Sequence, residues 1–389
     1  MSTVAALRAI GRQLDDPGRT IDELLAARPE PPTLLALGEP THGIAAFPLL
    51  RNELLGHLVE RGYRSIVLET DMFAAFVVND YVSGAAAEID NVLATGFSHG
   101  FGALPANREL VEWLRTHNAD RAPSDRVHFH GFDAPTEYSA APSPRHALTA
   151  AASYLPEALR PESVRDIDTL VGDDADWTNS AAMFDPAASI GDSDRARALR
   201  IVADDLASAL RRAAHPADDA IAHARTAQSL LRYHAAMASS APDRIATMVS
   251  VRTEMMADNL LSIVARERQR GPILVFAHNA HLRRAPAGAD VSWGSAGALV
   301  AHTLGERYLF LATDANPHSE PGTLQHMLAE ATNRRALFPT QALSAALPES
   351  IGTGKPIVPG HIPLNPAELA GTDAVIFIND TDGKRHQYW

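Results

Sequence analysis

Short apolar runs that close on polar residues recur along this chain. The run at residues 33–37 ends at Gly38 and Glu39, and the run at 65–69 ends on a glutamate. Apolar runs of about four to eight residues, bounded by turn residues, are typical of strands buried on both faces of a parallel sheet. We therefore expect strands at residues 33–37, 65–69, 127–132, 273–277, 308–312 and 374–378.

Between these runs, apolar residues recur at helical spacing. This spacing predicts helices over residues 3–14, 20–28, 47–61, 72–83 and 105–118. From about residue 145 to 268 the pattern is almost entirely helical, with breaks near Pro186, Pro216 and Pro242.

The alternation of strands and helices predicts an α/β fold with a central, mostly parallel sheet flanked by helices. We expect residues 1–140 and 270–389 to form this catalytic core, and residues 141–269 to form a helical insertion. Sheets of this kind bind ligands beyond the carboxyl ends of their strands. The insertion is expected to act as a lid over that cleft.

Composition narrows the function. The chain has 389 residues, 46% of them hydrophobic and 21% charged, which suits a folded enzyme. Its formal net charge of −13 argues against a nucleic-acid partner, because such binding needs clustered Lys and Arg. We also expect no membrane partner and a cytoplasmic location, because neither an export signal nor an apolar run of about 20 residues is evident.

The absence of cysteine restricts the chemistry further. It excludes disulfides, thiol catalysis and Cys-ligated metal sites. Any metal would therefore need histidine and carboxylate ligands.

The strongest local signal is Glu39-Pro40-Thr41-His42, directly after a predicted strand. Imidazole titrates near neutral pH and can take a proton from water, and a neighbouring carboxylate can orient the ring. A second signal, His278-Asn279-Ala280-His281, also follows a predicted strand. Its two histidines would share one side of a helical turn.

Three further acidic residues follow predicted strands. Glu69 and Asp71 come after the second strand, and Asp133 comes after the third. They could take part in the site, or they could form structural ion pairs with cations such as Arg51 or Arg252.

His128 and His130 alternate along a predicted strand and therefore share one face of the sheet. They could form a metal pair or two hydrogen-bonded histidines, and we favour the second interpretation.

Several motifs in order resemble the erythromycin esterase-like family. They are Leu35-Ala36-Leu37-Gly38-Glu39-Pro40-Thr41-His42-Gly43 with Arg51, then Ile66-Val67-Leu68-Glu69, Gly131-Phe132-Asp133-Ala134, Arg252 with Met256-Ala257-Asp258-Asn259-Leu260, and Ala277-His278-Asn279-Ala280-His281. The motifs run from about residue 34 to 313. The chain departs from the usual pattern at Pro40 and Thr253, which leaves the expected catalytic positions intact but puts the substrate in doubt.

The resemblance implies an α/β hydrolase that opens an ester or lactone bond of a small molecule, such as a macrolide antibiotic. It places His42 as general base and Glu39 as the carboxylate beside it, with Glu69 and His278 also catalytic. It implies that His278 or His281 polarises the ester carbonyl or stabilises the oxyanion. Substrate-binding roles are expected for Arg51, His281, Asp71, Asp133 and Arg252.

We expect no metal or other cofactor, but three alternatives remain open. A metallohydrolase could use His42, His278 and His281 with Glu39 or Glu69 as ligands. A biosynthetic enzyme of the same fold could form a lactone or another ring. A binding protein could hold a small molecule in the same cleft without turning it over.

Overall fold

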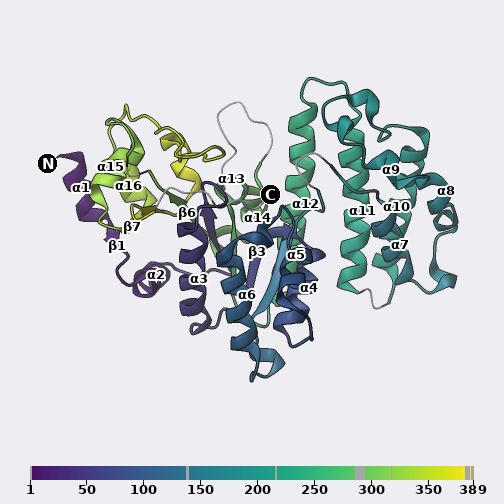
Figure 1. Cartoon of the computed structure of the whole chain (residues 1–389), viewed down its shortest axis with the longest axis horizontal. Coiled ribbons are helices and arrows are strands. Elements are labelled where there is room, and N and C mark those ends of the chain that lie inside the picture. The colour runs from purple at the N-terminus through teal and green to yellow at the C-terminus, as the bar shows by residue number, and fades with distance from the viewer. Residues whose placement is uncertain are drawn as a thin grey trace. The chain divides into compact units, whose positions relative to one another are not determined.

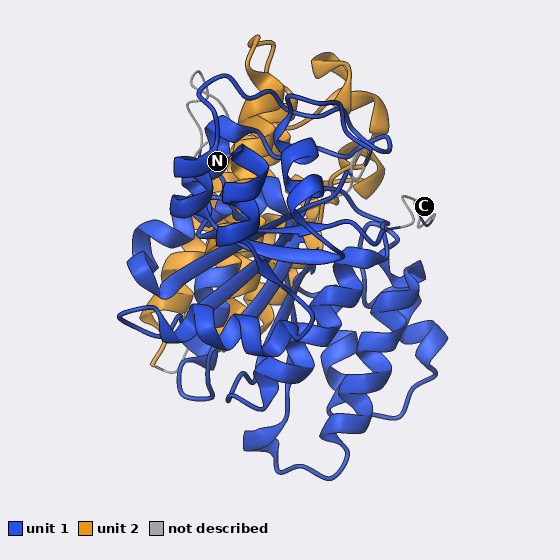
Figure 2. Cartoon of the chain, turned by 90° about the vertical axis from the view of Figure 1, so that its left-hand side faces the viewer, with its two compact units in different colours: residues 1–132, 260–389 blue, residues 133–259 orange. Residues whose placement is uncertain are grey.

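The structure is a computed structural model that describes residues 2–136, 140–214, 217–284, 294–316, 318–381 and 386. The chain forms two compact units. Unit 1 comprises residues 1–132 and 260–389, and unit 2 comprises residues 133–259 (Figure 2). The expected domain boundaries at 140 and 270, and the lid role of the insertion, stay predictions.

In the part of the chain that the structure describes, one sheet of eight strands forms the centre of unit 1, in the order β1-β7-β8-β6-β2-β5-β3-β4. Figure 1 labels β1, β3, β6 and β7 of this sheet. Strands β3, β5, β2, β6 and β8 run parallel, while β7 pairs antiparallel with β8 and β1 antiparallel with β7. The expected α/β fold with a mostly parallel sheet and flanking helices is confirmed. The strands are β1 Arg12–Gln13, β2 Leu34–Glu39, β3 Ser65–Asp71, β4 His128–Asp133, β5 Ile273–His278, β6 Tyr308–Asp314, β7 Arg335–Pro339 and β8 Ala374–Ile378.

Two strands at one edge of the sheet, β1 and β7, differ from the expectation. The helix expected over residues 3–14 ends at Ile10, and Gly11 leads the chain into β1. A Cβ at Gly11 would lie 2.6 Å from the ring of Phe338 on β7, so only glycine permits this close approach. β1 pairs antiparallel with a strand more than 300 residues away in the sequence, which local periodicity cannot predict.

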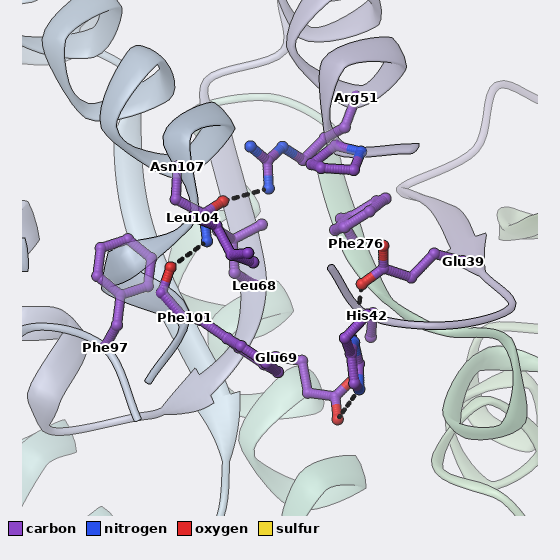
Figure 3. Close-up of a pocket in the computed structure, with 12 residues that line it drawn as sticks. Glu39, His42, Arg51, Leu68, Glu69, Phe97, Phe101, Leu104, Asn107 and Phe276 are labelled. Carbon is purple, nitrogen blue, oxygen red and sulfur yellow. Dashed lines mark hydrogen bonds and ion pairs between the residues drawn. The ribbon is translucent and has the colours of Figure 1, made fainter. Parts of the chain in front are cut away.

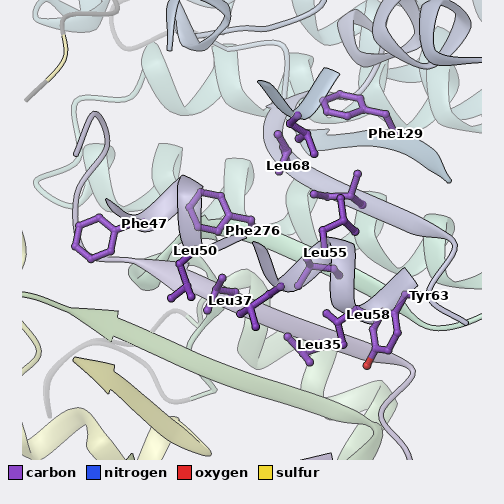
Figure 4. Close-up of a cluster of buried hydrophobic side chains, with 14 of the residues drawn as sticks. Leu35, Leu37, Phe47, Leu50, Leu55, Leu58, Tyr63, Leu68, Phe129 and Phe276 are labelled. Atoms are coloured by element: carbon purple, nitrogen blue, oxygen red, sulfur yellow. The ribbon is translucent and has the colours of Figure 1, made fainter. Parts of the chain in front are cut away.

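Helices cover both faces of the sheet. Leu35 and Leu37 of β2 lie in one buried cluster with residues of α3 (Figure 4). The same cluster includes residues of α2, α4, α5 and α6. Elsewhere in unit 1, helix α14 contacts strand β6 and helix α15 contacts strand β8. The helices of unit 1 are α1 Thr3–Ile10, α2 Pro17–Ala26, α3 Ala46–Val59, α4 Ala74–Val82, α5 Ile89–Thr95, α6 Pro105–Asn118, α13 Asn279–Leu282, α14 Ala296–Leu304, α15 Leu324–Ala331 and α16 Thr340–Ala346.

Unit 2 is helical, as the sequence predicts for this stretch. Its core is built mainly from alanine and leucine of α7, α10 and α11, with the buried Trp177. Its helices are α7 Arg145–Ser153, α8 Ile167–Val171, α9 Asp174–Trp177, α10 Asp194–Arg212 and α11 Asp218–Met237, and α12 Arg244–Glu267 continues from unit 2 into unit 1.

Short 3-10 helices complete the described elements. They are η1 Phe101–Ala103, η2 Pro123–Asp125, η3 Glu157–Leu159, η4 Glu162–Asp166, η5 Ser180–Met183, η6 Pro186–Ala188, η7 Gly305–Arg307 and η8 Pro366–Gly371. Within the described ranges, the helices are all too short or too polar to cross a membrane.

Candidate active site

The two strongest sequence motifs meet at the carboxyl edge of the sheet. Strands β2 and β5 are parallel neighbours, and their register places Glu39 directly beside His278. Because both strands end there, the loop that follows β2 and the short helix α13 emerge side by side. Segments that are more than 200 residues apart in sequence thus form one site.

His42 and Glu39 form a hydrogen-bonded pair. The Nδ1 atom of His42 lies 2.8 Å from Oε1 of Glu39 (Figure 3). Burial is the largest influence on Glu39 and raises its pKa, while the contact with His42 acts in the opposite direction. An ionised Glu39 accepts a hydrogen bond from the Nδ1–H group of His42, which leaves the lone pair of the ring on Nε2.

Glu69, which is buried on β3, lies between three histidine groups. Its Oε1 is 3.7 Å from Nε2 of His42 and 3.3 Å from Nε2 of His281. Its Oε2 accepts a hydrogen bond from the backbone N–H of His278 at 2.8 Å. Glu69 therefore connects both histidine motifs.

Both ring nitrogens of His278 are engaged by the main chain. Its Nε2 donates to the carbonyl oxygen of Pro40 at 3.0 Å, and its Nδ1 accepts from the N–H of Ala280 at 3.1 Å. Burial, followed by the nearby His42, lowers the pKa of His278 to about 3, so the ring is neutral near pH 7. In this geometry His278 has no ring nitrogen to offer a metal or a substrate, which argues against the three-histidine metal site.

Arg51 is a buried cation on α3. Its guanidinium donates to Asn107 Oδ1 at 2.9 Å and lies 5.0 Å from the centre of the Phe276 ring. Burial lowers the pKa of Arg51 to about 10, and attraction to Glu39 opposes this. Arg51 thus remains charged near pH 7, and its charge favours the ionised form of Glu39.

A pocket of about 360 Å³, including its opening to solvent, lies beside this cluster (Figure 3). Its polar lining comes from Glu39, His42, Arg51, Glu69 and Asn107. The rest of its lining is apolar, namely Pro48, Leu68, Phe97, Phe101, Leu104, Phe276 and Ala277. A few polar groups in an apolar pocket are the usual arrangement of a small-molecule site.

The segment around Phe97 and Phe101 lines the pocket but lies outside the sequence motifs described above. The rings of Phe101 and His42 have their centres 4.8 Å apart, and the Phe101 carbonyl accepts from Asn107 at 2.9 Å. Between them, His99 has a φ of 57°, which is rare for a residue other than glycine. The signal in the sequence was Phe97 and Phe101 on either side of Ser98, His99 and Gly100, a pattern that indicates a loop carrying aromatic side chains.

Three expected substrate-binding residues form hydrogen bonds within the protein. Oδ1 of Asp71 accepts from the N–H groups of Phe73 and Ala74, at 2.8 and 2.6 Å, before α4. In unit 2, Arg252 makes a two-pronged ion pair with the fully buried Asp133, with 2.9 Å between Nε and Oδ1. Their substrate-binding roles stay predictions.

The fold and this site together define an α/β protein with a histidine–carboxylate pair at the carboxyl edge of a parallel sheet, a class to which water-activating enzymes belong. The chain belongs to the erythromycin esterase family, whose model matches residues 58–381. The resemblance found in the sequence is thereby confirmed, and it supports an ester hydrolase with a small-molecule substrate. Because the match begins after Glu39 and His42, the case for these two residues rests on geometry.

Three solved structures share the fold. A Bacillus cereus protein is 16% identical with a TM-score of 0.71, covering 97% of each chain. A succinoglycan biosynthesis protein is 14% identical with a TM-score of 0.69, covering 97% of this chain and 96% of the other. A histidine mutant of the erythromycin esterase EreC, in an open conformation, is 18% identical with a TM-score of 0.67, covering 94% and 95%.

Proposed function

We propose that this protein hydrolyses an ester or lactone bond of a small molecule, with His42 as the base that activates water. The observation that carries the proposal is the 2.8 Å contact between His42 Nδ1 and Glu39, which directs the other ring nitrogen toward Glu69 at the pocket. A histidine oriented by a carboxylate is the arrangement that enzymes use to remove a proton from a nucleophile.

In the proposed reaction, Nε2 of His42 takes a proton from a water molecule, whose oxygen then attacks the ester carbonyl. The imidazolium that forms is stabilised by Glu39 on one side and by Glu69 on the other. The resulting tetrahedral oxyanion needs a donor. His281 is the histidine of the second motif suited to this role, because His278 is held by the main chain.

Collapse of the tetrahedral intermediate breaks the bond between the carbonyl carbon and the leaving oxygen. The imidazolium of His42 returns its proton to that oxygen, so the products are a carboxylic acid and an alcohol. For a lactone, both groups remain in one ring-opened molecule. His278 serves as a positioning residue, because it ties the end of β5 to the carbonyl of Pro40 in the loop that carries His42.

The pocket supports an apolar substrate. Its volume of about 360 Å³ includes space open to solvent, so the enclosed part of the pocket is small. Phe97, Phe101 and Phe276 line it. We infer that it receives the reacting ester and the adjoining hydrocarbon of a larger ring, such as a macrolactone, rather than the whole ring.

The proposal is tested with chelator-treated protein, a panel of macrolides and simpler lactones, and ¹⁸O-labelled water. Wild type should yield a ring-opened product that carries one labelled oxygen in its carboxylate, as seen by mass spectrometry. His42→Asn should reduce kcat by about 10²–10⁴-fold. His57→Gln is the matched control, because His57 pairs with Asp22 at 3.2 Å and does not line the pocket.

Binding of a panel member without turnover, unchanged by His42→Asn except in affinity, would instead support a binding protein. Turnover that the chelator abolishes and added metal restores, with no change in Tm, would contradict the metal-independent mechanism.

A further inference from the structure

A second cluster of ionisable side chains lies apart from the catalytic edge. His128 and His130 project from one face of edge strand β4, and Glu267 is the last residue of α12. The cluster contacts Ser65, the first residue of β3, whereas Glu69 lies four residues further along that strand. At about 3.3 Å per residue, some 13 Å of strand separate the two positions.

The three side chains converge on one carboxylate oxygen. Oε1 of Glu267 is 3.1 Å from Nδ1 of His128 and 3.4 Å from Nε2 of His130. One ligand atom from each residue lies within 4.8 Å of the others. Ligand atoms about 2.0–2.1 Å from a tetrahedral zinc ion are about 3.3 Å apart, so both histidine–carboxylate separations match such a site.

The carboxylate of Glu267 is held in place by its other oxygen. Oε2 accepts hydrogen bonds from Ser65 Oγ at 2.7 Å and from Arg270 Nε at 2.8 Å. Metal-binding carboxylates and histidines are usually oriented by such outer partners. The charge of Arg270 will weaken cation binding, but it sits on the oxygen that faces away from the histidines.

His130 supplies an independent observation. Its Nε2 is fully buried, and its contact with Glu267 does not have hydrogen-bond geometry, so the atom makes no hydrogen bond to the described residues. A buried polar atom of this kind needs an explanation, such as an ion.

We propose that His128, His130 and Glu267 bind a divalent transition-metal ion of the zinc class. Two imidazoles and one carboxylate suit Zn²⁺ or Co²⁺, with a fourth position left for water. The side chain of His128 is 27% exposed, which gives the ion a path from solvent. The ion would join the edge of the sheet to the end of α12, so we infer a structural role that is independent of ester hydrolysis.

Metal binding is measured on protein without a polyhistidine tag, stripped with a chelator and dialysed. Titration with Zn²⁺ should show one equivalent bound, and Co²⁺ should give the visible absorption bands of a tetrahedral site. Added Zn²⁺ should raise Tm in a concentration-dependent way, because the ion binds the folded state. These readouts do not depend on finding a substrate.

His128→Gln is the informative variant, since its partial exposure lets the fold tolerate the change. It should weaken Zn²⁺ binding by at least about 10-fold and remove the Tm increase. His42→Asn and His57→Gln should bind Zn²⁺ as wild type does. The proposal is overturned if stripped wild type takes up no Zn²⁺, or if binding survives His128→Gln and is lost in His42→Asn.

Discussion

The side chain of Asn279 lies directly against the α-carbon of Gly38, at the point where the two catalytic motifs meet. A Cβ on Gly38 would be only 2.1 Å from Asn279 Oδ1. Asn279 Nδ2 also donates to the carbonyl of Thr313 on β6 at 2.8 Å, and Thr313 Oγ1 donates to the Gly38 carbonyl at 2.7 Å. These contacts among Gly38, Asn279 and Thr313 connect β2, β6 and α13. In the sequence, Glu39 directly follows Gly38 and His278 directly precedes Asn279.

Gly38→Ala should therefore disturb both stability and activity. The added methyl group must displace Asn279, and overpacking of this kind costs about 1–3 kcal/mol in the free energy of unfolding. We expect a lower urea midpoint and a kcat reduced more strongly than KM is changed. Gly56→Ala is the control, because nothing lies within 4 Å of a Cβ there and α3 should be slightly stabilised. Wild-type kcat and stability in Gly38→Ala would show that the contact between Gly38 and Asn279 does not position the site.

The sequence predicted the parts of the fold that depend on short-range patterns. The strands β2 and β5 are continuous apolar runs up to their last one or two residues, so this local pattern identified them. Glu39 and His42 could be paired in advance because they are three residues apart. The contact of Glu69 with His281 could not, because it depends on the strand order β2-β5-β3, which no local pattern encodes.

Strand β7 and the orientation of the His278 ring also could not be predicted from local sequence patterns. Strand β7 has only three consecutive apolar residues, Ala336 to Phe338, whereas β8 has five, so the run in β7 is too short to distinguish from a helical turn. The sequence pointed to His278 as a catalytic candidate, but whether a ring nitrogen is free depends on its rotamer and on the carbonyl of Pro40. Both the rotamer and the position of that carbonyl are visible only in the folded chain.

Glu39→Gln should lower kcat with little change in KM. The amide retains the shape of the side chain but removes the charge that stabilises the His42 imidazolium, so we expect a loss of about 10²–10⁴-fold in kcat. Steady-state kinetics on whichever substrate the panel identifies will measure it. Glu53→Gln on α3, where the exposed Glu53 pairs with the partly buried Arg335, should leave kcat unchanged. A rise in KM alone for Glu39→Gln would assign Glu39 to substrate binding.

Asp71 should affect stability more than substrate affinity. Asp71→Ala removes the acceptor for two backbone N–H groups before α4, which should cost about 1 kcal/mol in the free energy of unfolding. Asp71→Asn keeps an acceptor oxygen and should recover most of that loss. Both variants should retain the wild-type KM. A raised KM in the stable Asp71→Asn variant would instead establish the substrate-binding role expected from the resemblance.

His278 should make folding stability depend on pH. Burial lowers its pKa to about 3 in the folded chain, against about 6.5 for an ordinary histidine. Between pH 3 and pH 6.5 the unfolded chain binds one more proton at this residue than the folded chain does. The stability that the neutral, buried His278 contributes is therefore fully present above about pH 6.5 and is lost as the pH falls toward 3. The resulting slope is about 1.4 kcal/mol per pH unit within that window.

The measurement is the free energy of unfolding in urea between pH 7 and pH 4.5, for wild type and His278→Asn. Asparagine can still donate to the Pro40 carbonyl but does not titrate, so the difference between the two proteins should shrink as the pH falls. His57→Gln, at a partly exposed histidine on α3, is the control and should keep the wild-type slope. Parallel curves for wild type and His278→Asn would mean that the folded chain protonates His278 readily, and the ring would then be available to act on the substrate.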